Sequence, residues 1–428
     1  MKMFVSFCCL LLQISFAIAA EPTELRTWQA TSGHKVQAKA TQVDEGTVHL
    51  EKEDGKVVRV PLAKFVAADQ ERLKKHFEIS DEPALADGSG AKAAEGLPHP
   101  VGEITGPVQA GTNSSYYVYL PKSLKQGRKA PLLFYTNSIN GNGKWIQELT
   151  EYAELFGWVV AISVESCNKA GYEKSKASCK LALEHIMATL PVDDERIHYT
   201  GNSGGGAVAF LNSETMAAYG ILPNTSYALE SVKVRTTVVY ALGGGYDYNR
   251  YLTADAAERY KKDGFHRMTK LSHNRAPADH RGDGMFWMHC KYLGDAKKDH
   301  QEEAKDFEIS TLEWLATLKQ DNPKRAYSNA IVFQEIYQPE GSNGRALEQL
   351  IKELAEDKDN VLYHEALLAI DKFSGKYYAP LGEDAGSEMG HKPPKRVVSA
   401  VEKLQLSYGH IPEINEVLEA MKKVTVKK

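Results

Sequence analysis

Residues 196–206 read Arg-Ile-His-Tyr-Thr-Gly-Asn-Ser-Gly-Gly-Gly, and this stretch decides the fold prediction. The first five residues favour a β-strand that ends at Gly201. Gly201 to Gly205 then form a G-x-S-x-G motif around Ser203, and the small residues that follow, 204–210, can continue as a helix. A strand, a tight turn and a helix in this order expose the serine as a nucleophile. The alternative is a glycine-rich loop beside a strand.

The glycines of the motif have a steric purpose. The turn around such a serine is so tight that its neighbours cannot carry large side chains, and Gly201 and Gly205 meet that need. At ordinary Gly and Ser frequencies, a chance match in a chain of 428 residues has a probability of about 0.2. The strand before the motif and the helix after it therefore carry more weight than the motif itself.

Working outward, the pattern of residues 101–320 alternates between strands and helices. Several strand segments are nearly continuous apolar runs, which is typical of strands covered on both faces. This alternation predicts a mostly parallel sheet between layers of helices. We expect strands at 108–110, 116–120, 132–136, 158–164, 196–200, 221–228, 235–242 and 265–271, and helices at 145–155, 179–190, 205–218, 253–262 and 283–292.

A serine hydroxyl needs a base to take its proton, and that base needs an acid to orient it. With this kind of turn the chain order is serine, acid, histidine. Asp247 follows the predicted strand 235–242, and the carboxyl end of a sheet strand is where such folds place active-site groups. We interpret Asp247 as the acid. A solvated loop aspartate or a helix cap is the alternative, and Asp255 is the nearest rival.

The candidate base is His273, which follows the last predicted strand, 265–271. His266 lies at the start of that strand, on the wrong edge of the sheet. His280 is the runner-up, and His289 lies on the next helix.

An oxyanion intermediate needs backbone donors. We expect the first from Gly204, directly after the nucleophile, and the second from Ser138 or Ile139 in the loop after strand 132–136. This chemistry implies neither a metal ion nor an organic cofactor. No Cys/His spacing in the sequence is that of a zinc site.

With these residues in order, the segment 101–320 resembles an α/β-hydrolase. Residues 196–206 are especially similar to secreted members of the polyhydroxyalkanoate depolymerase and feruloyl esterase kind. The resemblance implies an eight-stranded, mostly parallel sheet flanked by helices. It also implies that Ser203 is the nucleophile, Asp247 the acid and His273 the base of an ester hydrolase that works through an acyl-enzyme.

Residues 21–80 differ from this segment, because they form short alternating segments with turn signals between them. The dipeptide Asp54-Gly55 is a strong hairpin signal, and a short helix is predicted at 67–77. This segment resembles the Sla-type homology domain, a small Src-homology-like β-barrel. The resemblance rests on the order of Arg26-Thr27-Trp28, Asp54-Gly55-Lys56 and Val60-Pro61-Leu62. The resemblance implies a module that binds a peptide or a surface; a packing or spacer module is the alternative.

The remaining segments complete the predicted organisation. Residues 1–20 combine Lys2 with an apolar run and a small-residue end, which is typical of a secretory signal peptide. Residues 81–100 predict a flexible linker. Residues 321–428 predict a helical extension packed on the preceding domain or on a partner.

Export, charge and composition narrow the function further. The signal peptide predicts a periplasmic or secreted protein with no membrane span in the mature chain. A net charge of −4 with 25% charged residues gives no basic excess for nucleic acid. Three cysteines remain, Cys167, Cys179 and Cys290, too few for a disulfide scaffold, and pairing of the first two is left open.

We therefore expect an exported serine hydrolase that acts on a small or polymeric ester. A peptide substrate for the same residues is a subsidiary prediction. The alternative from a different class is a catalytically silent hydrolase fold that binds a partner through its N-terminal module.

Overall fold

The computed structural model describes residues 23–30, 35–44, 47–77, 96–124, 127–259, 263–385 and 392–423. The chain divides into two compact units, residues 1–89 and 90–428. The predicted signal peptide, 1–20, and most of the predicted linker lie outside the described residues.

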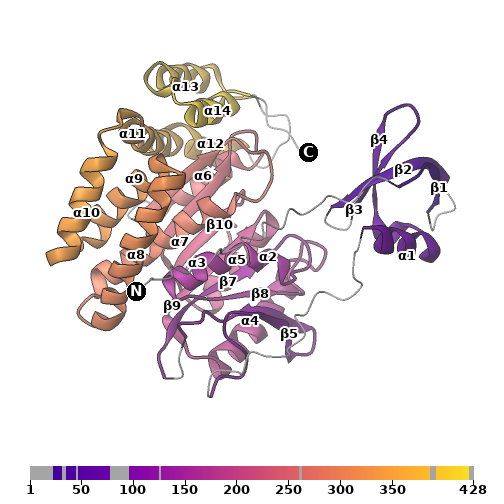
Figure 1. Ribbon diagram of the computed structural model, residues 1–428, viewed down its shortest axis with the longest axis horizontal. Helices are drawn as coiled ribbons and strands as arrows, with labels where there is room; N and C mark the ends of the chain where they lie inside the picture. Colours follow the sequence, from indigo (N-terminus) through magenta and orange to yellow (C-terminus); the bar gives the residue numbers. More distant parts are fainter. Residues whose placement is uncertain are drawn as a thin grey trace, which may run out of the picture. The chain divides into compact units, whose positions relative to one another are not determined.

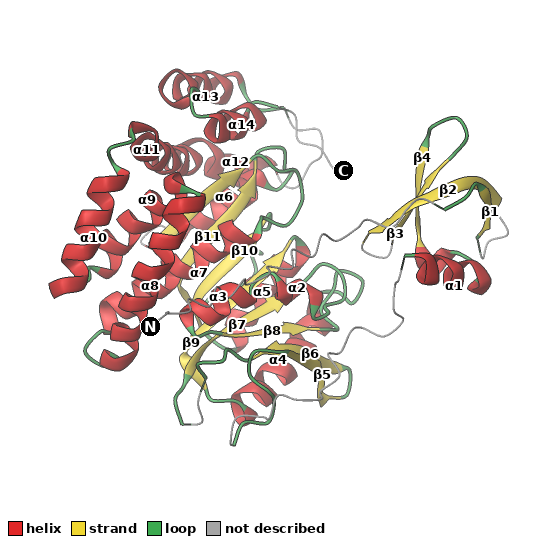
Figure 2. Cartoon of the chain, viewed as in Figure 1, coloured by secondary structure: helices red, strands yellow, loops and turns green. Residues whose placement is uncertain are grey.

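The N-terminal unit is a four-stranded antiparallel sheet with one short helix (Figure 2). Gly55 adopts a φ of 77°, which glycine tolerates best, and so turns the chain between the last two strands, confirming the predicted hairpin. Trp28 is buried and its indole N–H donates to the Ala38 carbonyl at 2.9 Å. The elements are β1 (Arg26–Gln29), β2 (Lys35–Asp44), β3 (Thr47–Glu51), β4 (Val57–Pro61), the short 3-10 helix η1 (Leu62–Lys64) and α1 (Ala67–His76).

The second unit is built on an eight-stranded sheet in the order β12-β11-β10-β9-β7-β8-β6-β5. Figure 2 labels its strands β5 to β11. β6 runs antiparallel to both its neighbours, and β7 to β12 are parallel to one another. Each of the eight predicted strands is present, and the order is that of an α/β-hydrolase. The bounds are β5 (Ile104–Gly111), β6 (Ser114–Tyr119), β7 (Ala130–Thr136), β8 (Val159–Ser163), β9 (Val192–Asn202), β10 (Ala218–Asn224), β11 (Thr236–Gly244) and β12 (Gly264–Thr269).

Helices cover both faces of this sheet. α4 and α5 contribute to one apolar core, and α3 and α7 contribute to the other. The bounds are α2 (Lys144–Gln147), α3 (Thr150–Phe156), α4 (Tyr172–Thr189), α5 (Gly204–Thr215), α6 (Arg250–Arg259) and α7 (Ala278–Ala296).

Several predicted elements differ from the structure at their ends. The expected helix 179–190 begins at Tyr172, the expected helix 205–218 ends at Thr215, and two further differences follow. The expected helix 145–155 is two helices, because the Thr150 hydroxyl donates to the Gln147 carbonyl and takes the place of a backbone partner there. The expected strand 221–228 ends at Asn224, because Thr225 adopts a left-handed φ of 44° and leaves the sheet.

The C-terminal helices belong to the same compact unit as the sheet (Figure 1). Asp283 of α7 accepts hydrogen bonds from Arg325 at 2.8 Å and from Arg267 at 2.7 Å, which joins the helices to β12. Of the two predicted locations, the preceding domain is therefore the one observed. The elements are α8 (Gln301–Asp321), α9 (Pro323–Val332), the π-helix η3 (Phe333–Tyr337), α10 (Gly341–Leu354), α11 (Lys358–Phe373), the π-helix η4 (Ser374–Tyr378), α12 (Ala379–Ala385), α13 (Lys395–Tyr408) and α14 (Pro412–Met421).

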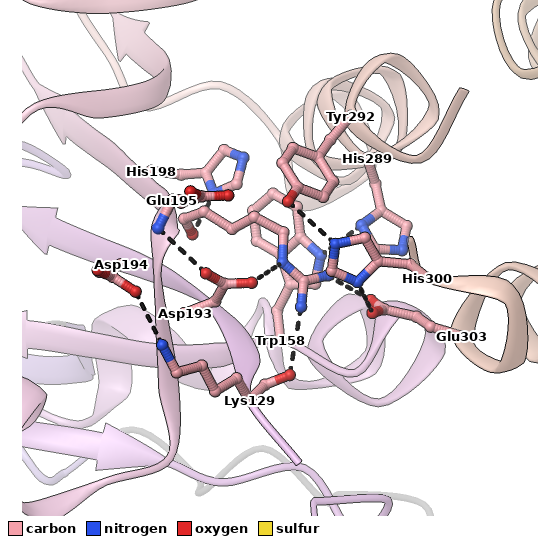
Figure 3. A network of polar contacts seen from close by, with 11 residues as sticks. Lys129, Trp158, Asp193, Asp194, Glu195, His198, His289, Tyr292, His300 and Glu303 are labelled. Carbon is pink, nitrogen blue, oxygen red and sulfur yellow. Dashed lines mark hydrogen bonds and ion pairs between the residues drawn. The ribbon is translucent and has the colours of Figure 1, made fainter. Parts of the chain in front are cut away.

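A buried polar network ties the amino half of β9 to its surroundings (Figure 3). Arg196 is 1% exposed; it donates to Asp193 at 2.7 Å, to Glu303 of α8 at 2.5 Å and to the Lys129 carbonyl at 3.2 Å. A buried cation needs such partners, since an unpaired one would lose its hydration without compensation. The network thus links β9, α8 and the start of β7.

Buried neutral histidines lie in and beside the sheet. The Trp158 indole donates to His289 at 3.1 Å, and His198 stacks on Trp158 with ring centroids 4.1 Å apart (Figure 3). Burial lowers the pKa of His198 and of His266 to about 3, and it lowers the pKa of His289 strongly. Neither ring nitrogen of His266 has a hydrogen-bond partner among the described residues. Within those residues, no helix is long and apolar enough to cross a bilayer.

Acid should therefore destabilise the fold. An unfolded histidine binds a proton near pH 6.5, whereas His266 stays neutral in the folded state down to about pH 3. Between these values the unfolded state holds more protons, so the free energy of unfolding falls as the pH falls, by about 1.4 kcal/mol per pH unit for each such histidine. Urea unfolding of His266→Leu between pH 6 and pH 4 should show a slope shallower by that amount. His410→Leu, at an exposed position, is the control; equal slopes for His266→Leu and the natural chain would contradict the assignment.

Candidate active site

Ser203 lies in a strained turn between β9 and α5. Its φ of 55° and ψ of −126° are values that a residue with a side chain rarely adopts. The turn is held from several sides: the Ser203 N–H donates to the Asn224 carbonyl at 3.0 Å, and the Ser203 carbonyl accepts from the Ser226 hydroxyl at 2.6 Å. The surrounding hydrogen bonds therefore over-determine a conformation that holds the serine at the carboxyl end of the central strands.

The glycines of the motif are required by close backbone contacts. A Cβ at Gly201 would lie 2.4 Å from the carbonyl carbon of Gly205, and a Cβ at Gly205 would lie 2.4 Å from the Thr136 carbonyl oxygen. Such distances are below any van der Waals contact. The start of α5 thus crosses directly over the ends of β7 and β9, as the G-x-S-x-G pattern predicted.

The three residues predicted from chain order meet at this edge of the sheet. His273 Nε2 lies 2.6 Å from Ser203 Oγ, and His273 Nδ1 lies 2.7 Å from Asp247 Oδ1. For Nε2 to accept the serine proton, Nδ1 must carry the ring hydrogen and donate it to Asp247. The serine comes from the turn after β9, the aspartate from the loop after β11 and the histidine from the loop after β12.

Asp247 is fully buried, and burial raises the pKa of its carboxyl group. His273 opposes this rise in pKa, and so does the Asn249 backbone N–H, which donates to Oδ1 at 3.0 Å. The second carboxylate oxygen has no partner among the described residues. His273 is the side chain that hydrogen-bonds to this carboxylate, and the carboxylate thereby orients the imidazole.

The rival residues lie elsewhere. Asp255 is on α6, where it pairs with Arg259 at 2.7 Å. His280 is on α7, and burial lowers its pKa to about 4. His266 is buried within β12, and His289 is on α7, where it accepts a hydrogen bond from the Trp158 indole.

The C-terminal helices support the loop that carries Asp247. A Cβ at Gly245 would lie 2.5 Å from Ala420 Cβ of α14, so the loop and the helix are in direct contact. The buried Arg250 donates to the Gly245 carbonyl at 2.6 Å and to the Lys423 carbonyl at 3.0 Å. The predicted extension thus makes a contact that its sequence did not reveal, since it supports the loop that carries Asp247.

The predicted oxyanion donors, Gly204, Ser138 and Ile139, differ in whether their backbone N–H groups already have a hydrogen-bond partner. Gly204 is the first residue of α5, and N–H groups of a first helical turn have no partner within the helix. The Ser138 N–H donates to Asn137 Oδ1 at 2.8 Å, so it is already engaged. Ile139 is 56% exposed. The first donor therefore has a free N–H direction, and the identity of the second stays a prediction.

A cavity of about 300 Å³ opens at Ser203. Its walls are mostly polar or aromatic, and two of its tyrosines, Tyr172 and Tyr227, join their hydroxyl groups at 2.8 Å. It is lined by Cys167, Asn168, Gly171, Tyr172, Ser203, Gly204, Val208, Tyr227, Tyr248 and Asn249.

Sequence reasoning missed Tyr248 and Asn168 as site residues. The Tyr248 ring stacks on His273 with centroids 4.1 Å apart and limits how the imidazole can turn. Its position directly after Asp247 was the only available signal. The described part of the chain holds no cluster of three or more His, Cys, Asp or Glu suited to a metal ion. Cys167 and Cys179 are separate buried thiols.

Comparisons with known proteins match the two units separately. Residues 18–80 match SLA1 homology domain 1, as the N-terminal pattern predicted. No curated protein matches the chain.

Solved structures similar to this chain include serine hydrolases. Esterase 2 of the planctomycete Thermogutta terrifontis is 16% identical over 40% of this chain and 82% of its own, with a TM-score of 0.32. Its sarin-phosphonylated form is 13% identical over 46% of this chain and 94% of its own, with a TM-score of 0.35. A fluorophosphonate-binding serine hydrolase of Staphylococcus aureus, with substrate bound, is 11% identical over 41% and 92% of the two chains, with a TM-score of 0.34.

The order of the strands defines the class of the larger unit as an α/β-hydrolase fold. This class is joined in one chain to an N-terminal SLA1 homology domain 1.

Proposed function

We propose that this protein is an exported serine hydrolase that cleaves carboxylic esters through an acyl-enzyme. The observation that carries the proposal is the continuous hydrogen-bonded series from Ser203 Oγ to His273 at 2.6 Å and on to Asp247 at 2.7 Å. Distances of this size are those at which a base activates a hydroxyl nucleophile. The strained turn at Ser203 and the adjoining cavity support the same conclusion.

In the proposed mechanism, Ser203 Oγ adds to the ester carbonyl carbon while His273 Nε2 takes the hydroxyl proton. The carbonyl electron pair moves onto the oxygen, and the Gly204 N–H stabilises the resulting oxyanion. His273 then gives its proton to the departing alcohol, which leaves an acyl-serine. A water molecule, activated by the same histidine, releases the acid. Asp247 keeps the imidazole in the required tautomer throughout.

The residues of this mechanism all lie in the larger unit. The peptide- or surface-binding role of the N-terminal module stays a prediction, as does peptide hydrolysis by the larger unit. Should the hydrolase unit be silent, a binding role through the module is the alternative.

Labelling with a fluorophosphonate tests the nucleophile. The reagent should modify the natural chain, and Ser203→Ala should abolish the modification because the reacting oxygen is gone. Ser342→Ala, at an exposed hydroxyl on α10 away from the serine turn, should retain labelling and serves as the control. Intact-protein mass spectrometry measures the adduct. Equal labelling of natural chain and Ser203→Ala would remove Ser203 from the mechanism, and labelling of neither would favour a silent fold.

The size and polarity of the cavity predict preference for short or polar ester groups. A space of about 300 Å³ walled by tyrosines and asparagines cannot solvate a long alkyl chain as an apolar tunnel would. Across nitrophenyl esters, kcat/KM should therefore be at least about 10-fold higher for acetate or propionate than for octanoate. A 10-fold ratio corresponds to a difference of about 1.4 kcal/mol in activation free energy. A higher value for octanoate would contradict this interpretation of the cavity.

Export is part of the proposal and has its own test. The apolar run of residues 4–18 and the Ala17-Ile18-Ala19-Ala20 end support cleavage near Ala20. Protein recovered from the periplasm or medium of an expressing bacterium should begin near Glu21 when its mature N-terminus is sequenced. Recovery of the full-length chain in the cytoplasm alone would argue against export.

A further inference from the structure

The second hydrogen-bond donor to the oxyanion is not identified by the contacts described so far. A tetrahedral intermediate usually needs two or more hydrogen-bond donors 2.7–3.1 Å from its oxygen. Gly204 supplies one direction, but the Ser138 N–H in the loop after β7 is occupied by Asn137 Oδ1 at 2.8 Å. Because the Ser138 N–H is already engaged, we consider other hydrogen-bond donors that line the cavity at Ser203.

Asn168 and Gly204 both line the cavity that contains Ser203. A Cβ at Gly204 would lie 1.9 Å from Asn168 Oδ1 and 3.2 Å from Asn168 Nδ2, so the side-chain amide presses directly on this glycine. Among the described residues, no hydrogen-bond partner holds that amide in place. A half turn about the Cβ–Cγ bond, a soft torsion in asparagine, exchanges its oxygen and nitrogen.

The backbone of Asn168 is well anchored even though its side chain is exposed. Its N–H donates to the Ser138 carbonyl at 2.9 Å, and its carbonyl accepts from the Gly171 N–H at 3.2 Å. The loop of Asn168 is therefore joined to the loop after β7 on the same side of Ser203. A side chain on such an anchored loop is presented from a fixed position, which lowers the entropy cost of its hydrogen bond.

We propose that the Asn168 amide is a catalytic hydrogen-bond donor to the oxyanion. The inference rests on the proposed function. As Ser203 Oγ bonds to the carbonyl carbon, the carbonyl π pair moves to the oxygen and the serine proton moves to His273. Asn168 Nδ2–H and the Gly204 N–H then donate to that oxygen, and no proton is transferred from either. The donor strengthens as charge develops, so it acts on kcat more than on KM.

Steady-state hydrolysis of nitrophenyl acetate by the full chain tests the role. Asn168→Ala should lower kcat about 100-fold with little change in KM, as for loss of one oxyanion donor. Asn168→Asp keeps the shape of the side chain but replaces the donor by a carboxylate, so it should lose at least as much at pH 8. Lys169→Ala, the exposed neighbour on the same loop, is the matched control and should retain full activity. Thermal unfolding of each variant verifies that it is folded.

A second variant tests the contact between Asn168 and Gly204 by changing Gly204. Gly204→Ala places a methyl group where the Asn168 amide now lies, and the exposed Asn168 side chain can rotate away from it while its backbone stays anchored. It should therefore lower kcat comparably, and the double variant should lose little more than either single one, because both remove one interaction. Additive losses would overturn the proposed contact.

The outcomes separate this inference from the proposed function. If the natural chain neither hydrolyses any ester of the panel nor reacts with the fluorophosphonate, both fall. If it does both, and Asn168→Ala or Asn168→Asp stays within about twofold of it in kcat, only the inference falls. A slowed reaction of both variants with the fluorophosphonate supports the donor independently of turnover, since the phosphonyl oxygen occupies the same site.

Discussion

The strained backbone at Ser203 is the constraint on which the rest of the site depends. A φ of 55° at a serine persists only when its surroundings hold it. Here the start of α5 passes so close to the ends of β7 and β9 that only glycine fits at positions 201 and 205. The same close passage directs Ser203 Oγ out of the sheet and toward the loops that follow β11 and β12, where His273 and Asp247 lie.

The remainder of the larger unit keeps those loops and strands in place. At the amino half of β9, Arg196 joins the strand to α8 and to the residue before β7. Near the carboxyl edge, α14 packs on Gly245 and Arg250 bonds to both segments. The C-terminal helices thus support the loop that carries Asp247. Their apolar faces were visible in the sequence, but the surface they cover was not.

The local signals in the sequence predicted much of this arrangement because they reflect local physical needs. Glycines beside Ser203 indicated a turn without room for side chains, and apolar runs indicated strands covered on both faces. Chain order then assigned Asp247 and His273, since parallel strands bring their carboxyl ends to one edge. Contacts between loops far apart in the chain had no such signal. Asn168, Tyr248 and the occupied Ser138 N–H were therefore missed.

The sequence by itself determined the N-terminal module, the eight strands and the order of the three residues, because each depends on patterns of neighbouring residues. Only the tertiary structure decided what surrounds them: the bracing of the Asp247 loop by α14, the stacking of Tyr248 on His273 and the approach of Asn168 to Gly204. Those contacts join loops whose conformations depend on packing across the whole sheet. No short stretch of sequence carries that information.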